Sequence, residues 1–166
     1  PTQSSPYASY VTNIVLANNV DKQNNPVGPS TQFYVNQGIF VVMRVRNPPV
    51  GTHVIEAVWF INGTPMTPEP PDSVGKTVSG SANVYFMLVS RVAGAGQIRI
   101  LWDAPPGDDG SAAYDPHLVA TINFTVIAVA PGTTTPTPGP TPPGPFGPTP
   151  TPVPTMTPAF TPTPSA

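Results

Sequence analysis

The chain has 166 residues, of which only 8% are charged, and its formal net charge is −2. All of its basic residues lie before residue 116 and are scattered singly or in pairs, so it lacks the basic face that nucleic-acid binding requires. It has no cysteine and no apolar run long enough to cross a bilayer, which excludes disulfides, thiolate metal sites, a cysteine nucleophile and a membrane span.

The first predicted element is a strand over residues 7–17, which are rich in β-branched and aromatic side chains. A polar connection with prolines and a glycine follows over residues 18–31. A strand on so long a tether could pair within its own domain or be given to another copy, and both alternatives stay open. If it is exchanged, Tyr10, Val11, Ile14 and Leu16 are the candidate assembly residues.

Residues 32–47 alternate between apolar and polar side chains, which predicts one strand with a buried and a wet face, bent or bulged at Gly38. Residues 53–62 are apolar on both parities and predict a central strand with Trp59 in the core. Asn62-Gly63 indicates a hairpin turn. The proline-rich return over residues 64–73 fits only a sheet edge or a loop.

Residues 76–90 alternate again and predict a further strand, after which Gly94 and Gly96 are expected to turn the chain. Strands are predicted over residues 97–104 and 118–130, on either side of a long loop. No stretch has an apolar repeat of 3.6 residues, so no helix of more than two turns is expected. The side chains expected in the core are Val41, Met43, Trp59, Phe86, Ile100, Trp102, Ile122 and Phe124.

These elements predict an all-β fold, an antiparallel β-sandwich of about seven strands. We divide the chain into an N-terminal strand at 1–20, a sandwich core at 21–130 and an extended tail at 131–166. The order of strands resembles immunoglobulin-like and fibronectin-III-like modules of secreted surface proteins, many of which continue into Thr/Pro-rich stalks. The resemblance covers residues 7–130 as architecture only, since the Cys…Trp…Cys signature of true immunoglobulin domains is absent.

The tail has fourteen prolines, eleven threonines, four glycines and no charged residue. Proline fixes φ and has no amide hydrogen, so an extended polyproline II-like segment is expected. Threonines beside prolines in such a backbone are candidate O-glycosylation sites, with a bare linker as the alternative. These candidates are Thr133, Thr134, Thr135, Thr137, Thr141, Thr149, Thr151, Thr155, Thr157, Thr161 and Thr163. Phe146 and Phe160 are candidate assembly residues, because they could pack in apolar grooves.

Within the sandwich, Asn62-Gly63-Thr64 and Asn123-Phe124-Thr125 match the N-glycosylation sequon, which makes Asn62 and Asn123 candidate glycan sites. For Asn62, the turn already explains the residue.

Little in the chain indicates catalysis. His53 and His117 lie far apart in the sequence, and no hydrolase, P-loop or dinucleotide motif occurs, so we expect neither an enzyme nor a cofactor. Four acidic residues crowd one loop region and could hold calcium, although a solvated turn is the favoured interpretation. These are Asp103, Asp108, Asp109 and Asp115.

The layout of a β-domain followed by an extended segment also resembles subunits of extracellular protein filaments. It implies a structural subunit, extracellular or on the cell surface, that polymerises through its terminal segments, with copies of itself and covalent glycans as its partners. The alternative is a stalked cell-surface adhesion or carbohydrate-binding module. That alternative requires the exposed tyrosines to form one flat platform; the candidates are Tyr7, Tyr10, Tyr34, Tyr85 and Tyr114.

Overall fold

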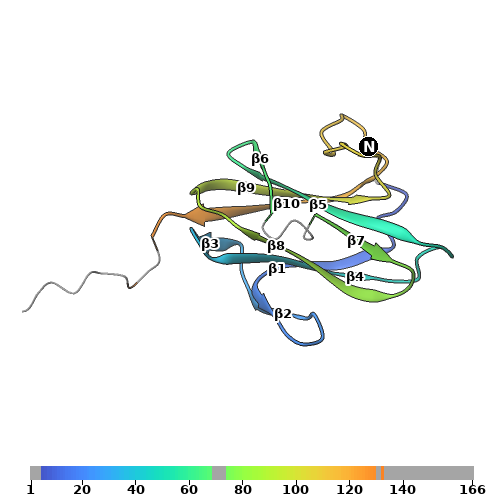
Figure 1. Ribbon diagram of the computed structural model, residues 1–166, viewed down its shortest axis with the longest axis horizontal. Coiled ribbons are helices and arrows are strands. Elements are labelled where there is room, and N and C mark those ends of the chain that lie inside the picture. The colour runs from blue at the N-terminus through green and yellow to red at the C-terminus, as the bar shows by residue number, and fades with distance from the viewer. Residues whose placement is uncertain (1–4, 69–73, 130–131, 133–166) are drawn as a thin grey trace, which may run out of the picture. The chain divides into compact units, whose positions relative to one another are not determined.

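The computed structural model describes residues 5–68, 74–129 and 132, and every regular element in this part of the chain is a β-strand (Figure 1). The strands are β1 (Val11–Val20), β2 (Pro26–Pro29), β3 (Gln32–Tyr34), β4 (Gly38–Val45), β5 (His53–Ile61), β6 (Thr64–Met66), β7 (Gly75–Val78), β8 (Ala82–Val89), β9 (Gly94–Trp102) and β10 (Leu118–Ile127). One sheet has the order β2-β1-β4-β8. The other has the order β3-β10-β9-β5-β6, with β7 also paired to β5.

The hydrophobic core lies between the two sheets, and the expected core is confirmed with one qualification. Seven of the expected side chains are buried, and Trp59 and Trp102 are among the largest that are fully enclosed. Ile122 packs against the core but is only partly buried. The period-two alternation therefore predicted correctly which side chains of β4, β8, β9 and β10 point inward.

The connectivity is that of an immunoglobulin-like sandwich. β1, β4 and β8 are neighbours in one sheet, and β10, β9 and β5 in the other, which corresponds to strands A-B-E and G-F-C of that fold. Trp59 on β5 occupies the strand that carries the buried tryptophan in immunoglobulin domains. The sandwich is not wholly antiparallel as expected, because β3 pairs with β10 in parallel.

Two predicted strands are each divided between the sheets. Residues 32–47 form β3 in one sheet and β4 in the other, because Asn36 adopts a left-handed φ of 65° and the amide of Gln37 bonds the carbonyl of Tyr34 in a turn. Residues 76–90 likewise form β7 and β8 in opposite sheets. The number of strands is therefore larger than the expected seven or so.

Two predicted connections are also partly strand. The segment 18–31 contains the end of β1 and all of β2, joined by a polar turn around Asp21. Gly94 and Gly96 do not turn the chain but belong to β9. A Cβ at Gly96 would overlap the ring of Phe124, so glycine is needed there for close packing against the neighbouring strand.

The N-terminal strand pairs within its own domain. β1 begins at Val11, later than expected, and lies between β4 and β2, with Val11 and Leu16 buried. Among the described residues, no helix is long and apolar enough to cross a membrane. The expected polyproline II-like tail lies outside the described residues except for Gly132, as do the proline-rich residues 69–73.

Candidate functional site

One side of the sandwich is open between β1 and β10. β9 covers one edge of β10, whereas β3 covers the other edge only at residues 125–127. In the described part of the chain, no strand pairs with this second edge from residue 118 to residue 124. In the facing sheet, β2 pairs with the outer edge of β1 from Ala17 onward, and the Ser30 amide that follows β2 donates to the carbonyl of Leu16. Both sheets therefore have an uncovered edge on the same side.

The direction of the free backbone groups on β10 follows from its pairing with β3. The amide of Thr125 donates to Thr31, and the carbonyl of Ile127 accepts from Val35, so both residues direct their backbone groups away from β9. This direction alternates along a strand. The amides and carbonyls of Thr121 and Asn123 therefore also point outward, and they can pair with an added strand.

An apolar groove of about 440 Å³ lies beside this edge. A bulge between Thr12 and Val15, with Asn13 at a left-handed φ of 52°, inserts an extra residue into β1. Before the bulge the odd-numbered Val11 points inward, whereas after it the even-numbered Ile14 and Leu16 do. Ile14 and Leu16 therefore face the groove. The lining residues are Ile14, Val15 and Leu16 of β1, Ile122 of β10, and Pro29, Ser30 and Thr31.

The edges of the sandwich are protected to different degrees. β1, β8 and β10 contain no charged residue, whereas proline and lysine, which natural edge strands use to prevent pairing, occur at Pro65 in β6 and Lys76 in β7. β8 also has a free edge in the described residues, but its inward side chains are at most 5% exposed. Among the described residues, the core is thus closed at β8, whereas a groove opens at the β1–β10 side.

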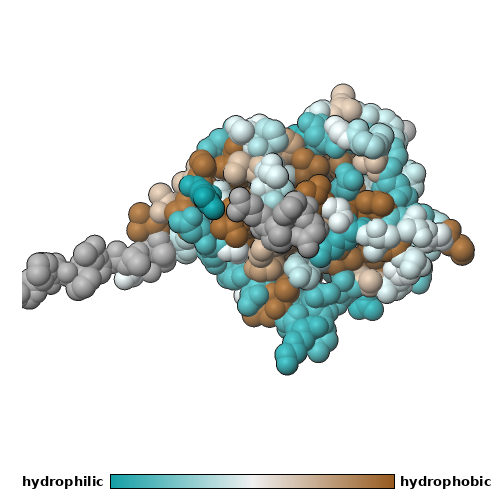
Figure 2. Space-filling view, viewed as in Figure 1, coloured by the Kyte–Doolittle hydropathy of each residue, from teal (hydrophilic) through white to brown (hydrophobic). Residues whose placement is uncertain are grey.

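The surface agrees with the low charge of the chain. On the face shown in Figure 2, hydrophobic and near-neutral residues cover much of the sandwich, and the polar β1–β2 turn projects as a hydrophilic knob. A surface of this kind has few charges to oppose contact between copies.

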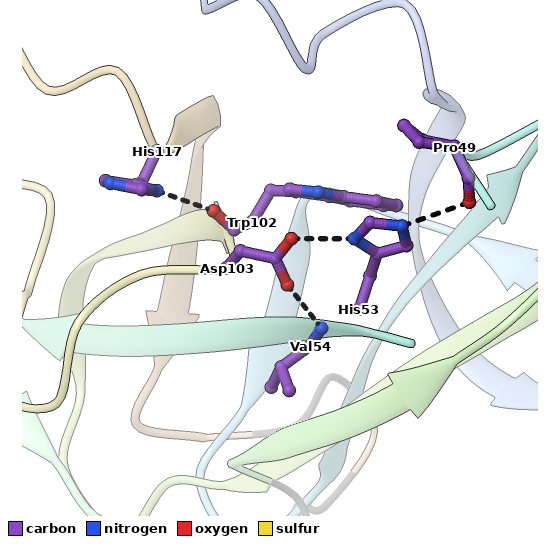
Figure 3. A network of polar contacts seen from close by, with 6 residues as sticks. All are labelled: Pro49, His53, Val54, Trp102, Asp103 and His117. Atoms are coloured by element: carbon purple, nitrogen blue, oxygen red, sulfur yellow. Dashed lines mark hydrogen bonds and ion pairs between the residues drawn. The ribbon is translucent and has the colours of Figure 1, made fainter. Parts of the chain in front are cut away.

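A histidine–aspartate pair lies where β5 begins and β9 ends (Figure 3). His53 Nδ1 lies 2.7 Å from Asp103 Oδ2, and the amide of Val54 donates to Asp103 Oδ1, also at 2.7 Å. His53 Nε2 lies 3.1 Å from the carbonyl oxygen of Pro49, and the ring packs on Trp102. Both ring nitrogens and both carboxylate oxygens therefore have a partner within the fold, which is the arrangement of a structural contact.

The pKa values of the pair follow from this contact. The hydrogen bond to Asp103 raises the pKa of His53, against burial that lowers it. Burial raises the pKa of Asp103, but the bonds from His53 and the Val54 amide outweigh it, and the net shift is downward. The pair is thus an ion pair in mildly acidic solution, and it fastens β5 to β9.

The segment before β1 packs against the same end of the sandwich. Tyr7 stacks on Trp102 and His117, with ring centroids 6.2 and 6.0 Å apart, and Tyr10 lies 5.8 Å from Trp102. Ser5 Oγ donates to the carbonyl of Pro116 at 2.6 Å. Tyr10 is therefore held inside its own domain in this structure, and does not present a free assembly surface.

The remaining assembly candidates divide into three groups. Val11 is buried in the core, and Ile14 and Leu16 line the groove described above. Phe146 and Phe160 lie outside the described residues, as do the threonine candidates of the tail.

The two N-glycosylation candidates differ in their surroundings. Asn62 occupies the predicted turn at a φ of 51°; its Nδ2 donates to Ala93, and its Oδ1 accepts from the amide of Ala95. Asn123 is exposed on the outer face of β10, and only its Oδ1 is bonded, to Gln97. The nitrogen that would carry a sugar is thus engaged at Asn62 and accessible at Asn123.

The acidic loop region does not bring its carboxylates together. Asp108, Asp109 and Asp115 each accept a hydrogen bond from the backbone amide two residues later, which is the geometry of a polar turn. Asp103 is bound to His53. Within the described ranges, no group of three His, Asp or Glu side chains could hold a metal ion.

The tyrosines do not form one platform. Tyr7 lies beside His117 at the start of β10, whereas Tyr34 pairs with Ile127 at its end. Tyr85 belongs to the other sheet, where it contacts Phe40 and Lys76, and Tyr114 lies on the loop before β10.

A polar hollow of about 480 Å³ on the outer face of the second sheet had no signal in the sequence. Here Asn123 accepts from Gln97, Gln97 accepts from Arg99, and Arg99 donates to the Asp109 carbonyl. The Arg99 guanidinium lies over the ring of Phe60 at 4.4 Å. Predicting this row of polar side chains requires the register of β5, β9 and β10, which cannot be read from the sequence pattern.

No protein-family model matches the chain, and no match was found among the curated proteins compared with it. Among solved structures, it is similar to the CARDB domain of a Pyrococcus furiosus protein that was crystallised with di-metal ions. The match has 14% sequence identity and a TM-score of 0.38, and covers 76% of this chain and 95% of that one. The fold assignment therefore depends on the strand order and register given above, and the metal ions of that domain imply nothing for this chain.

Proposed function

We propose that this chain is a structural subunit of an extracellular filament that assembles through its terminal segments. The observation that carries the proposal is the open side of the sandwich, where an apolar groove lies beside a strand edge with no charge to protect it. An uncovered edge of this kind is a template for pairing with another chain. Proteins usually block such an edge with lysine, proline or a covering segment.

The two termini have different roles in this proposal. The N-terminal strand β1 stays in its own domain and provides Ile14 and Leu16 to the groove. The Pro/Thr-rich C-terminal segment reaches a neighbouring copy. Contacts between two different surfaces do not close into a ring unless the rotation between copies allows it, so they propagate as a fibre. The exposed Asn123 and the tail threonines are the glycan sites of such a subunit.

Electron microscopy of the full chain and of a chain ending at Gly132 tests the proposal. We expect filaments from the first and none from the second. Ile122→Thr in the groove is expected to weaken assembly, whereas Val50→Thr, at a fully exposed position away from the groove, serves as the matched control. Filaments that form equally well without the tail would contradict the proposal.

The second candidate function is a stalked carbohydrate-binding module, which the polar hollow favours. Amide and guanidinium side chains on a concave sheet face can bond sugar hydroxyl groups. Glycan-array binding that Gln97→Ala abolishes, in a chain that stays monomeric, would select this function over the filament.

A further inference from the structure

The proline positions near the C-terminus follow a strict parity. Between residues 148 and 164, every proline has an even number, and every odd-numbered residue retains its amide hydrogen. The even-numbered residues are Pro148, Pro150, Pro152, Pro154, Met156, Pro158, Phe160, Pro162 and Pro164. The odd-numbered residues are Thr149, Thr151, Val153, Thr155, Thr157, Ala159, Thr161 and Thr163.

This parity has a specific meaning for a β-strand. Successive residues of a strand direct their backbone groups to opposite edges and their side chains to opposite faces. An extended segment with this sequence has a full set of donors and acceptors along one edge, from its odd-numbered residues. Along the other edge most amide donors are missing, which is the position where proline is tolerated in sheets. It also has one apolar face and one face rich in threonine.

The open side of the sandwich is complementary to such a strand. Thr121 and Asn123 direct their amides and carbonyls outward, and their exposed side chains lie on the outer face of the sheet. Residues paired across two strands have their side chains on the same face. In an antiparallel pair, an odd-numbered residue opposite Thr121 would exchange both backbone hydrogen bonds with it and place its own side chain on the outer face of the sheet. The even-numbered prolines would then enter the groove beside Ile14 and Ile122.

We propose that residues 148–164 of one copy add as an antiparallel β-strand to the free edge of β10 in a neighbouring copy, with their proline face in the groove. This inference rests on the proposed function for its partner, a second copy. The added strand would extend the sheet that contains β10, on the edge that β3 covers only in part. Because its other edge has few donors, it would also prevent a further strand from pairing.

The length of the segment favours contact with more than one copy. At about 3.3 Å per residue, a strand of this length extends about 55 Å, whereas the free edge of β10 extends only about 23 Å. One domain cannot pair with the whole patterned segment, so the rest of it is available to the next copy. β8 is a less suitable acceptor, because its inward side chains are already enclosed and leave no hollow for the prolines.

Cysteine cross-linking of the full-length chain tests the proposal without background, because the chain has no cysteine. An isotope-labelled chain with Thr121→Cys is mixed with unlabelled chains that each carry one substitution in the tail, at an odd position (Thr151→Cys, Thr155→Cys) or an even one (Pro152→Cys, Pro154→Cys). Disulfides between labelled and unlabelled chains are then measured by mass spectrometry. A chain with Ile14→Cys probes the groove, and one with Met87→Cys on β8 is the matched control edge.

We expect Thr121→Cys to cross-link at least fivefold more with odd positions, and Ile14→Cys with even positions. Met87→Cys should cross-link with neither. Equal cross-linking of both parities, or preferential cross-linking at β8, would overturn the proposal. A chain with both Thr121→Cys and Thr151→Cys tests the same-copy alternative. A disulfide within that chain, when the mixed single variants form none, would also overturn the proposal, since the partner would then be the same copy.

A second set of variants changes which positions of the tail carry proline. Thr151→Pro with Thr155→Pro removes edge donors and should reduce the cross-linking at least fivefold, whereas Pro152→Ala should not. Microscopy of the same samples separates this inference from the proposed function. Parity-dependent cross-links without filaments would support strand addition and reject the filament. Filaments without those cross-links would do the reverse.

Discussion

His53 and Asp103 join the start of β5 to the end of β9 through a contact whose strength depends on pH. The pKa of His53 is raised in the folded state, so its contribution to stability is complete below about pH 6.5 and is lost as the pH rises through the folded-state pKa. The pKa of Asp103 is lowered, so its contribution is present above about pH 4 and is lost as the pH falls through its folded-state value.

We therefore expect the free energy of unfolding to fall by about 1 kcal/mol between about pH 5 and about pH 8.5. The value is small for a charged pair because Asp103 is partly exposed, and solvent weakens the contact. Urea titrations at both pH values, followed by the fluorescence of the buried Trp59 and Trp102, measure this change. Asp103→Asn should be less stable than the parent at the lower pH and should reduce the difference between the two. An unchanged difference in that variant would show that another group is responsible.

Asn62 and Asn123 provide a second prediction at the residue scale. When the chain is secreted by a cell that attaches N-glycans, we expect sugar on Asn123 and none on Asn62, because Asn62 Nδ2 is bonded to Ala93 within its turn. Glycopeptide mass spectrometry distinguishes the two sites. Asn123→Gln should remove the glycan mass, whereas Asn62→Gln should leave it unchanged. A glycan on Asn62 would mean that the sugar is attached before this turn forms.

At the scale of elements, the sequence predicted the inward face of the alternating strands but not the sheet to which each of them belongs. Phe33 and Ile39 have the same parity and both point inward, although β3 and β4 lie in different sheets. The left-handed Asn36 moves the chain from one sheet to the other without disturbing the apolar pattern. Strand length and alternation alone therefore predicted one continuous strand.

The groove could not be predicted for a related reason. Its two walls come from β1 and β10, about a hundred residues apart, and their proximity depends on sheet order. The bulge at Asn13 also changes which residues of β1 face it. The sequence did indicate Ile14 and Leu16 as assembly residues, but through strand exchange, whereas in the structure both of them line the groove of their own domain.

The position of β1 inside a sheet leads to a prediction about N-terminal truncation. Deleting residues 1–10 removes the Tyr7 and Tyr10 contacts with Trp102 but keeps β1, so we expect a folded domain with a melting temperature lower by several degrees. Deleting residues 1–20 removes a strand between two neighbours, together with the buried Val11 and Leu16, and should prevent folding. Circular dichroism and tryptophan fluorescence report both results.

A contrary result would be informative here. If the chain without residues 1–20 folded and bound an added peptide of that sequence, β1 would be an exchangeable strand. The division of roles between the two termini would then have to be reversed.

At the scale of the whole molecule, the low charge predicts how assembly responds to salt. Only 8% of the residues are charged, and the groove and the β10 edge carry no charged side chain. The proposed contact between copies would therefore depend on apolar burial and backbone hydrogen bonds. Raising sodium chloride from about 0.05 M to about 1 M shortens the Debye length from more than 10 Å to about 3 Å, which weakens contacts between exposed charges. We expect the critical concentration for assembly to change less than about twofold over this range, and to fall in sodium sulfate, which favours apolar burial. Light scattering against protein concentration measures both effects.

Thr121→Lys provides the control for a contact that does depend on charge, because it places a charge on the outer face beside the pairing edge. A strong loss of assembly in sodium chloride would show that the few charged residues, and not the open side of the sandwich, hold the copies together.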